Sequence, residues 1–311
     1  MSCPPRTSQK KTNRILLVGC TNGLSHALVN RLQEPLHVLG TQTPKLTGRT
    51  KKQDVIYLPV RLSHTIFSQL KKERFDSIIH AGFLWPSIHT NTQNAALFNI
   101  QLLHRLLRLA CDVGVRQFIL ISAAYLYGPS EHTCGWLTEE SALHCAAHPN
   151  SRLSSMACMD TTVQAFLWQH KQIATTILRP VYTLGPQLNN AESQYLRLHR
   201  VPTVLGYDPM IQVVHQNDVV RAVKTVLRKR TRGVFHIVGD NQAPLMRLIQ
   251  ASGGSPLPMP AWMVERTGWP SSTDGLRFAC LVSGQKAQEQ LGYRPRMDMI
   301  QTLRALRADS S

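Results

Sequence analysis

The 311-residue sequence has no long apolar run, no paired cysteine motif and few aromatic residues. No apolar run approaches the roughly 18 residues that a membrane-spanning helix needs, and the opening MSCPPRTSQKKTNR has no apolar core of a secretory signal. Seven cysteines are scattered without a CxxC pair in a chain long enough to fold without disulfides, so free thiols in a reducing compartment are expected. These absences predict a soluble, cytoplasmic protein.

Acidic residues are also scarce. The 35 Lys and Arg residues outnumber 18 Asp and Glu residues, which gives a formal net charge of +17. The excess is concentrated in residues 1–52 and in Arg221–Arg232 (RAVKTVLRKRTR). It favours a polyanionic partner, nucleic acid or acidic protein, and the competing interpretation is a basic tail with a solvated helix face. Aromatic residues make up only 6% of the chain, so no aromatic platform adds to a nucleic-acid interpretation.

Apolar segments alternate between strand and helix patterns along the chain. The periodicity predicts strands at 14–19, 37–39, 55–58, 77–80 and 117–122, and helices at 25–32, 65–72 and 91–113. The strands are apolar without alternation, which is typical of a parallel sheet buried on both faces. The sequence therefore predicts a doubly wound α/β domain over 14–180, preceded by a basic tail at 1–13 and followed by a smaller region at 181–311. Some elements of that region are expected to return to the main sheet.

Eight features in one order carry a resemblance to a known family. They are Asn99 and the segments RILLVGCTNGLSHAL (14–28), FDSIIHAG (75–82), VGVRQFILISAAYLYGP (113–129), ILRPVYTLGP (177–186), VVHQNDVVRAV (213–223), GVFHIVGDN (233–241) and KAQEQLGYRPRM (286–297). Together they resemble the extended short-chain dehydrogenase/reductases, the NAD-dependent epimerases and dehydratases that act on nucleotide sugars. The resemblance implies a Rossmann-type domain, a substrate-side C-terminal region, and a homodimer formed through helices near 93–113 and 151–171.

The proton-transfer residues of that family are missing. The family uses a Tyr, a Lys four residues later that lowers the Tyr pKa, and a Ser or Thr that positions the substrate. No Tyr in this sequence is followed by Lys at that spacing, and the best register places Met156 and Asp160 at the two positions. The Ser/Thr position falls on Ala123, with Ser122 one residue early. A carboxylate in place of the Lys would raise the pKa of a neighbouring phenol.

The cofactor turn is altered less. The extended family's Gly-x-x-Gly-x-x-Gly falls on Gly19, Asn22 and Ser25, whereas the shorter branch's pattern matches Gly19 and Gly23. Such glycines let backbone N–H groups approach a pyrophosphate. The residues expected to contact NAD or NADP are Gly19, Thr21, Asn22, Gly23, Leu24, Ser25, Arg61, His80, Ala81, Gly82, Asn99, Ser122, Arg179, Pro180 and Val181.

Two functional hypotheses remain open from the sequence. The first is a catalytically degenerate family member that binds a nucleotide or nucleotide sugar, or serves as a scaffold or regulator. The second is an active NAD(P)-dependent oxidoreductase, epimerase or dehydratase with unfamiliar acid/base groups such as Asp160, His80 or a loop histidine. No metal site is expected, because the loop residues His132, Cys134, His144, Cys145 and His148 lack the spacing of a structural zinc site.

Overall fold

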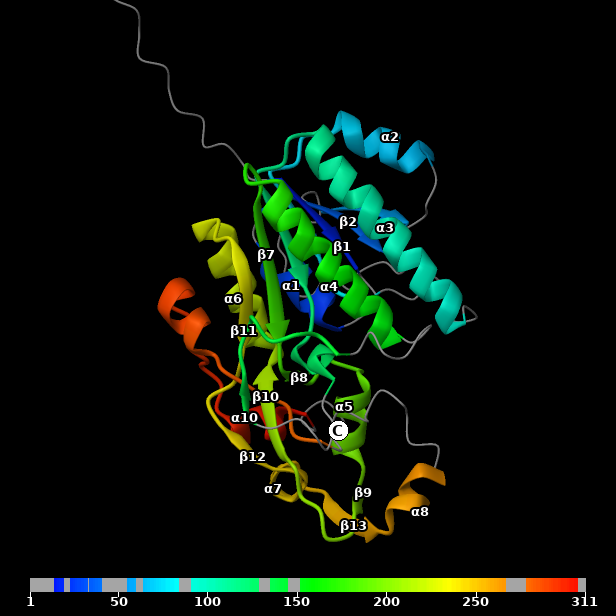
Figure 1. The fold of residues 1–311 in the computed structure, drawn as a ribbon, viewed down its shortest axis with the longest axis vertical. Coiled ribbons are helices and arrows are strands. Elements are labelled where there is room, and N and C mark those ends of the chain that lie inside the picture. The colour runs from blue at the N-terminus through cyan, green and yellow to red at the C-terminus, as the bar shows by residue number, and fades with distance from the viewer. Residues whose placement is uncertain are drawn as a thin grey trace, which may run out of the picture.

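The computed structural model describes nine segments of the chain, namely 14–19, 23–32, 34–40, 55–59, 64–83, 91–128, 135–144, 152–266 and 278–306. The main sheet has seven strands. Figure 1 shows it with helices on both faces, above a smaller region. The strand order is β11-β7-β5-β4-β1-β2-β3, and every neighbouring pair is parallel. This order confirms the predicted doubly wound α/β fold of the Rossmann type.

The strands of the main sheet consist of short apolar runs. They are β1 (Ile15–Val18), β2 (Leu36–Gly40), β3 (Val55–Pro59), β4 (Ser77–His80), β5 (Gln117–Ile121), β7 (Ala174–Pro180) and β11 (Gly233–Ile237). All residues of β1, β2, β4 and β5 are buried. Burial on both faces explains why these segments show no alternation of apolar and polar residues.

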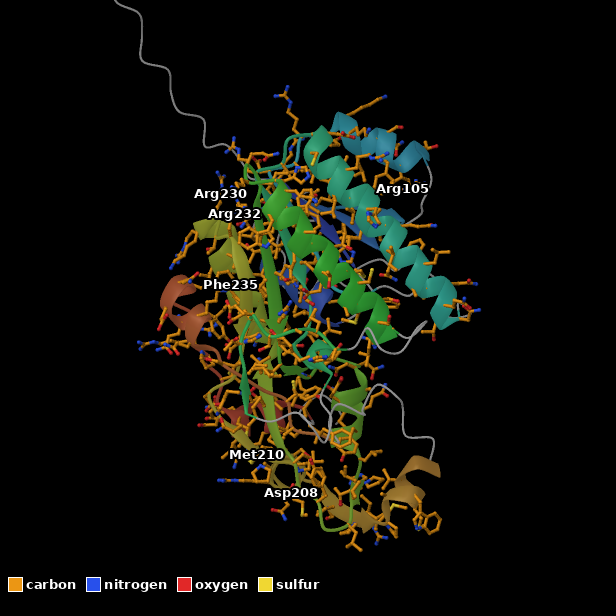
Figure 2. The ribbon with its side chains drawn as sticks, viewed as in Figure 1. Arg105, Asp208, Met210, Arg230, Arg232 and Phe235 are labelled. Atoms are coloured by element: carbon orange, nitrogen blue, oxygen red, sulfur yellow. The ribbon has the colours of Figure 1, made fainter. Side chains whose placement is uncertain are left out.

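Two helical layers cover the sheet. One consists of α1 (Gly23–Arg31) and α6 (Gln216–Lys229), and the other of α2 (His64–Lys72), α3 (Thr92–Asp112) and α4 (Arg152–Gln169). Figure 2 shows Phe235 within β11, and Arg230 and Arg232 between the end of α6 and that strand. α3 and α4, the helices of the expected homodimer, pack against each other and expose Leu97 and Trp168; dimerisation stays a prediction.

The chain after β7 contributes to both parts of the molecule. Its α6 and β11 join the main domain, while β8 (Tyr182–Leu184), β10 (Met210–His215) and β12 (Gln242–Pro244) form a second sheet. The remaining elements are η2 (Ala124–Tyr127), β6 (Trp136–Leu137), α5 (Ala191–Arg197), β9 (Arg200–Val204), α7 (Leu245–Ala251), β13 (Ser255–Met259), α8 (Ala261–Arg266), β14 (Leu281–Val282), η5 (Ala287–Leu291) and α10 (Met299–Ala305). None of the helices described here has the length and hydropathy needed to cross a membrane.

Candidate functional site

Asp160 is the centre of a buried polar cluster where α4 crosses the carboxyl ends of β5 and β7. Arg179 Nη2 lies 2.7 Å from Asp160 Oδ1, and Arg179 Nε donates to Oδ2 at 3.0 Å. Ser122 Oγ donates to the same Oδ2 at 2.5 Å, and Gln164 Nε2 donates to Oδ1 at 2.8 Å. The side chains of Asp160 and Arg179 are 0% and 1% exposed. A closed, bidentate ion pair therefore occupies the position predicted for the family's Lys.

The cluster continues from Arg179 to the edge strand of the sheet. Arg179 Nη1 donates to Tyr127 Oη at 2.6 Å, and that hydroxyl lies 2.7 Å from His236 Nε2 on β11. The other ring nitrogen, Nδ1, lies 2.8 Å from the Ser283 carbonyl oxygen, and Glu139 accepts a hydrogen bond from the His236 backbone N–H. These contacts join five separate segments into one buried network.

Burial sets the protonation states within this network. Desolvation raises the pKa of Tyr127 to about 12, against the opposing charge of Arg179, so the phenol stays protonated at neutral pH. Desolvation alone would lower the pKa of Arg179, but the hydrogen bonds and charge of Asp160 raise it. Burial lowers the pKa of His236, which keeps that imidazole neutral. The donors and acceptors of this network are therefore fixed, since none of these three groups changes its protonation state near neutral pH.

Met156 lies one helical turn before Asp160, in an apolar environment. It is buried in a cluster with Phe83, Ala123 and Leu126. The hydroxyl of Tyr125 contacts it, with Oη 3.9 Å from Met156 Sδ. Tyr125 also stacks on Tyr182, with ring centroids 5.9 Å apart and planes 10° from parallel.

The sequence pattern alone does not single out Tyr125. It has no Lys four residues later, and its contact with Met156 joins two separate elements. Its place between Ser122 and Gly128, in the segment after β5, was the available signal. A phenol from η2 thus lies beside the position of the family's Tyr, although α4 carries none there.

Gly19 and Gly23, on either side of the turn after β1, are glycines for different physical reasons. Gly19 has φ +120°, and a Cβ there would lie 3.3 Å from the Cβ of Ala81 at the end of β4. Gly23 begins α1, and a Cβ there would overlap the backbone carbonyl of Gln187. Ser25, at the third glycine position, donates its hydroxyl to the Gly19 carbonyl. Internal packing therefore explains Gly23, while the positive φ of Gly19 is a backbone conformation that glycine adopts without strain.

Several of the other residues predicted to contact the cofactor are buried, and some lie outside the described part of the chain. Asn99 is fully buried and donates to the Ala95 carbonyl within α3. Val181 is buried and its N–H donates to the Ile237 carbonyl, directly after Pro180 at the end of β7. Leu24 is buried in α1, and Gly82 follows β4 with φ +85°. Thr21, Asn22, Arg61, His132, Cys134, Cys145 and His148 lie outside the described residues.

His80 ends β4 between Val18 and Leu120 in the sheet register. Its side chain is fully buried, and neither ring nitrogen has a hydrogen-bond partner within the described part of the chain. Burial lowers the pKa of His80 to about 4. This imidazole is therefore neutral near pH 7 and lies close to the strand ends where the glycine turn begins.

Residues 15–238 match the NAD dependent epimerase/dehydratase family. The chain belongs to this family. Rv0501, an uncharacterized protein of Mycobacterium tuberculosis, is 26% identical over 248 residues, covering 75% of this chain and 65% of the relative. The family member described here thus spans about two thirds of that relative's length.

Solved structures of nucleotide-sugar enzymes share its fold. DesIV, a dTDP-glucose 4,6-dehydratase from Streptomyces venezuelae with NAD and TYD bound, matches at TM-score 0.69 and 20% identity over 95% of this chain and 97% of its own. MoeE5 in complex with UDP-glucuronic acid and NAD matches at TM-score 0.72 and 18% identity, over 94% and 97% of the two chains. Likeness at such identities establishes the fold, and the chemistry depends on this chain's own residues.

Proposed function

We propose that this family member is catalytically degenerate, and that it binds a nucleotide or nucleotide sugar at the carboxyl edge of its sheet as a binding or regulatory module. The observation that carries this proposal is the buried Asp160–Arg179 ion pair at the position of the family's Lys. An ammonium there lowers the pKa of the neighbouring phenol, whereas a carboxylate neutralised by Arg179 has no such effect. Met156, at the Tyr position, has no proton to transfer.

The strand edge supports ligand binding without catalysis. The positive φ of Gly19 at the end of β1 fits the glycine-rich turn that binds the pyrophosphate of a dinucleotide such as NAD or NADP. Gly19, Leu24, Ala81 and Gly82 would line that half of the cofactor. The Arg179 guanidinium offers no bidentate pair of donors to the other half of the cofactor. Its N–H groups already donate to Asp160, Tyr127 and the Glu139 carbonyl. A bound nicotinamide would supply hydride chemistry, and the residues for the accompanying proton transfer differ from the family's.

The second candidate is an active oxidoreductase, epimerase or dehydratase. The observation that favours it is the half-buried hydroxyl of Tyr125 beside Met156. A phenol at that place would have to act without the cation that normally lowers its pKa, so its proton transfer would be slow at neutral pH.

Calorimetric titration tests the proposal. NAD, NADP, UDP-glucose and dTDP-glucose are titrated into the full chain, and thermal unfolding is followed with each ligand, because binding to the folded state alone raises the melting temperature. We expect a shift with at least one ligand and no conversion of the sugar nucleotides during incubation with NAD or NADP, as followed by chromatography. Turnover that Tyr125→Phe abolishes would establish the second candidate, and no shift across the panel would overturn binding.

A matched pair of glycine variants locates the ligand. Gly19→Ala places a Cβ at φ +120° against Ala81, while Gly206→Ala places one at φ +76° with no atom within 4 Å. Both substitutions strain the backbone, but only the first changes the turn after β1. We expect Gly19→Ala to lose the ligand-induced shift and Gly206→Ala to keep it.

A further inference from the structure

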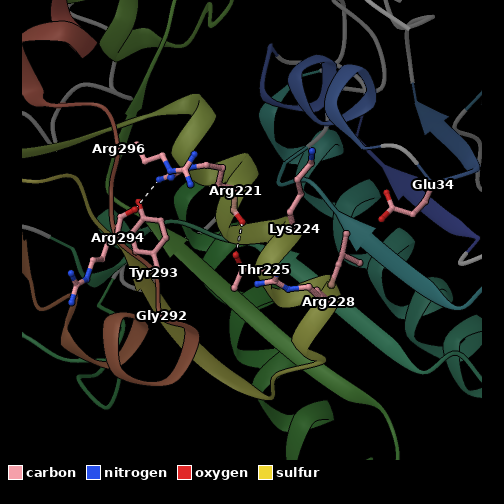
Figure 3. A pocket seen from close by; sticks show the side chains of 10 residues that line it. Glu34, Arg221, Lys224, Thr225, Arg228, Gly292, Tyr293, Arg294 and Arg296 are labelled. Carbon is pink, nitrogen blue, oxygen red and sulfur yellow. Dashed lines mark hydrogen bonds between the residues drawn. The ribbon is translucent and has the colours of Figure 1, made fainter. Parts of the chain in front are cut away.

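A hollow of about 580 Å³ lies between α6 and the segment that follows η5 (Figure 3). Its lining residues are Glu34, Arg221, Lys224, Thr225, Leu227, Arg228, Gly292, Tyr293, Arg294 and Arg296. Five of these ten residues are cationic and one is acidic. Glu34 lies two residues before the start of β2, so the hollow reaches the amino edge of the parallel sheet, opposite the carboxyl edge that holds Asp160.

Helical spacing places three of the cations together. Arg221, Lys224 and Arg228 follow each other at three and four residues and so lie on one face of α6. The opposite face carries Val219, Val223 and other apolar residues that are buried in the core. Packing of the apolar face fixes the cationic face toward the hollow, as Figure 3 shows.

The C-terminal segment is locked against this face. Arg221 Nη2 lies 2.8 Å from Asp218 Oδ1 and donates to the Arg294 carbonyl at 2.8 Å. Asp218 Oδ2 accepts the backbone N–H groups of Arg296 and Met297 at 3.1 and 3.2 Å. The contacts hold the two sides of the hollow in place before any ligand arrives, which lowers the entropic cost of binding.

Four further cations line the hollow besides Arg221. Within the described residues, no carboxylate lies within ion-pair distance of Lys224, Arg228, Arg294 or Arg296. The rest of the basic run is used differently: Lys229 Nζ donates to the Leu291 carbonyl, and Arg232 caps the Lys171 carbonyl near the end of α4. The described carboxylates therefore do not neutralise these four cations of the hollow.

We propose that this hollow is a binding site for a compact oligophosphate group, such as the diphosphate or triphosphate of a nucleotide or free inorganic tripolyphosphate. Its volume lies within the range of small-molecule sites, and guanidinium groups bind phosphate oxygens in a bidentate manner. Tyr293, the aromatic residue of the lining, is buried and donates to the Val238 carbonyl, so it offers no face on which a base could stack. The phosphates are thus the recognised part of the ligand, and a bounded hollow suits them better than a nucleic-acid strand.

Isothermal titration of the full chain with inorganic tripolyphosphate at low salt tests this site. Lys224→Gln, Arg228→Gln and Arg294→Gln are combined in one variant, and Lys72→Gln, Arg74→Gln and Arg108→Gln, at exposed positions on or beside α2 and α3, remove the same charge elsewhere. We expect tripolyphosphate to bind the unmodified chain, the first variant to lose at least about tenfold in affinity, and the second to lose less than about twofold. Arg228→Gln alone is the fallback variant should the triple substitution impair folding.

Three further titrations distinguish the sources and the sites. Adenosine triphosphate that binds as tightly as tripolyphosphate supports a phosphate-only site with nucleotides as a source. An oligonucleotide or polyglutamate that binds more tightly than tripolyphosphate, or equal losses in the two triple variants, would overturn the proposal in favour of general charge attraction. Gly19→Ala should leave tripolyphosphate binding unchanged, which separates this site from the one proposed at the turn after β1.

Discussion

Arginine serves opposite purposes at the two edges of the main sheet. At the carboxyl edge, Arg179 is 1% exposed and its guanidinium is bonded to Asp160, Tyr127 and the Glu139 carbonyl. At the amino edge, Lys224 and Arg228 face a hollow without a described carboxylate partner. A buried charge must be paired within the protein, whereas a charge that faces water is hydrated and stays available to a ligand. Burial therefore decides which of these cations stabilise the fold and which can bind.

The first prediction breaks the buried side of this comparison. Asp160→Ala leaves the Arg179 guanidinium buried without its counter-charge, so we expect the free energy of unfolding to fall by about 3–5 kcal/mol. Urea denaturation with both tryptophan fluorescence and circular dichroism measures it. The double variant Asp160→Leu with Arg179→Met removes both charges and should recover much of the loss. A single-variant loss below about 1 kcal/mol would contradict the role assigned to the pair.

The second prediction concerns pH and His80. Because burial lowers its pKa to about 4 from 6.5, the unfolded chain binds more protons than the folded chain between these values. The contribution of neutral His80 to stability is complete above pH 6.5 and is lost progressively as the pH falls toward 4. The full shift in its pKa corresponds to about 3 kcal/mol of unfolding free energy. His80→Phe should flatten this part of the stability profile, and His199→Gln, at an exposed position, should leave the profile unchanged.

The third prediction removes one hydroxyl from the buried network. Tyr127→Phe leaves Arg179 Nη1 and His236 Nε2 without their shared partner, at an expected cost of about 1–3 kcal/mol. Tyr207→Phe, at an exposed position, is the control and should be neutral. Equal melting temperatures for the two variants would show that the network does not depend on this hydroxyl.

The fourth prediction sharpens the comparison from the open side. The Lys224→Gln, Arg228→Gln and Arg294→Gln variant should melt within about 3 °C of the unmodified chain in ligand-free buffer, because exposed cations contribute little to stability. This small loss of stability is to be compared with the large loss expected for Asp160→Ala. A large destabilisation without ligand would assign these cations to the fold rather than to a site.

Local sequence patterns predicted most of the fold. The helix expected at 91–113 is α3, the strand expected at 117–122 contains β5, and α1 is the next element after β1, as the glycine motif predicts. The short elements after residue 180 were predicted less completely, since β9 and β13 pair across about fifty residues of chain. Pairings of that kind depend on long-range contacts that a local pattern does not contain.

The sequence by itself determined the family, the parallel sheet and the absence of a Tyr-x-x-x-Lys pair, because each of these is written in residue type and spacing. Only the tertiary structure decided what replaced that pair. Asp160 and Arg179 are 19 residues apart, and Tyr127 and His236 are 109 apart, yet all four meet at the strand ends. Likewise, α6 and the segment after η5 meet across about 70 residues to gather the cations of the hollow. Charge can be counted in a sequence, but pairing and burial depend on which distant segments the fold brings together.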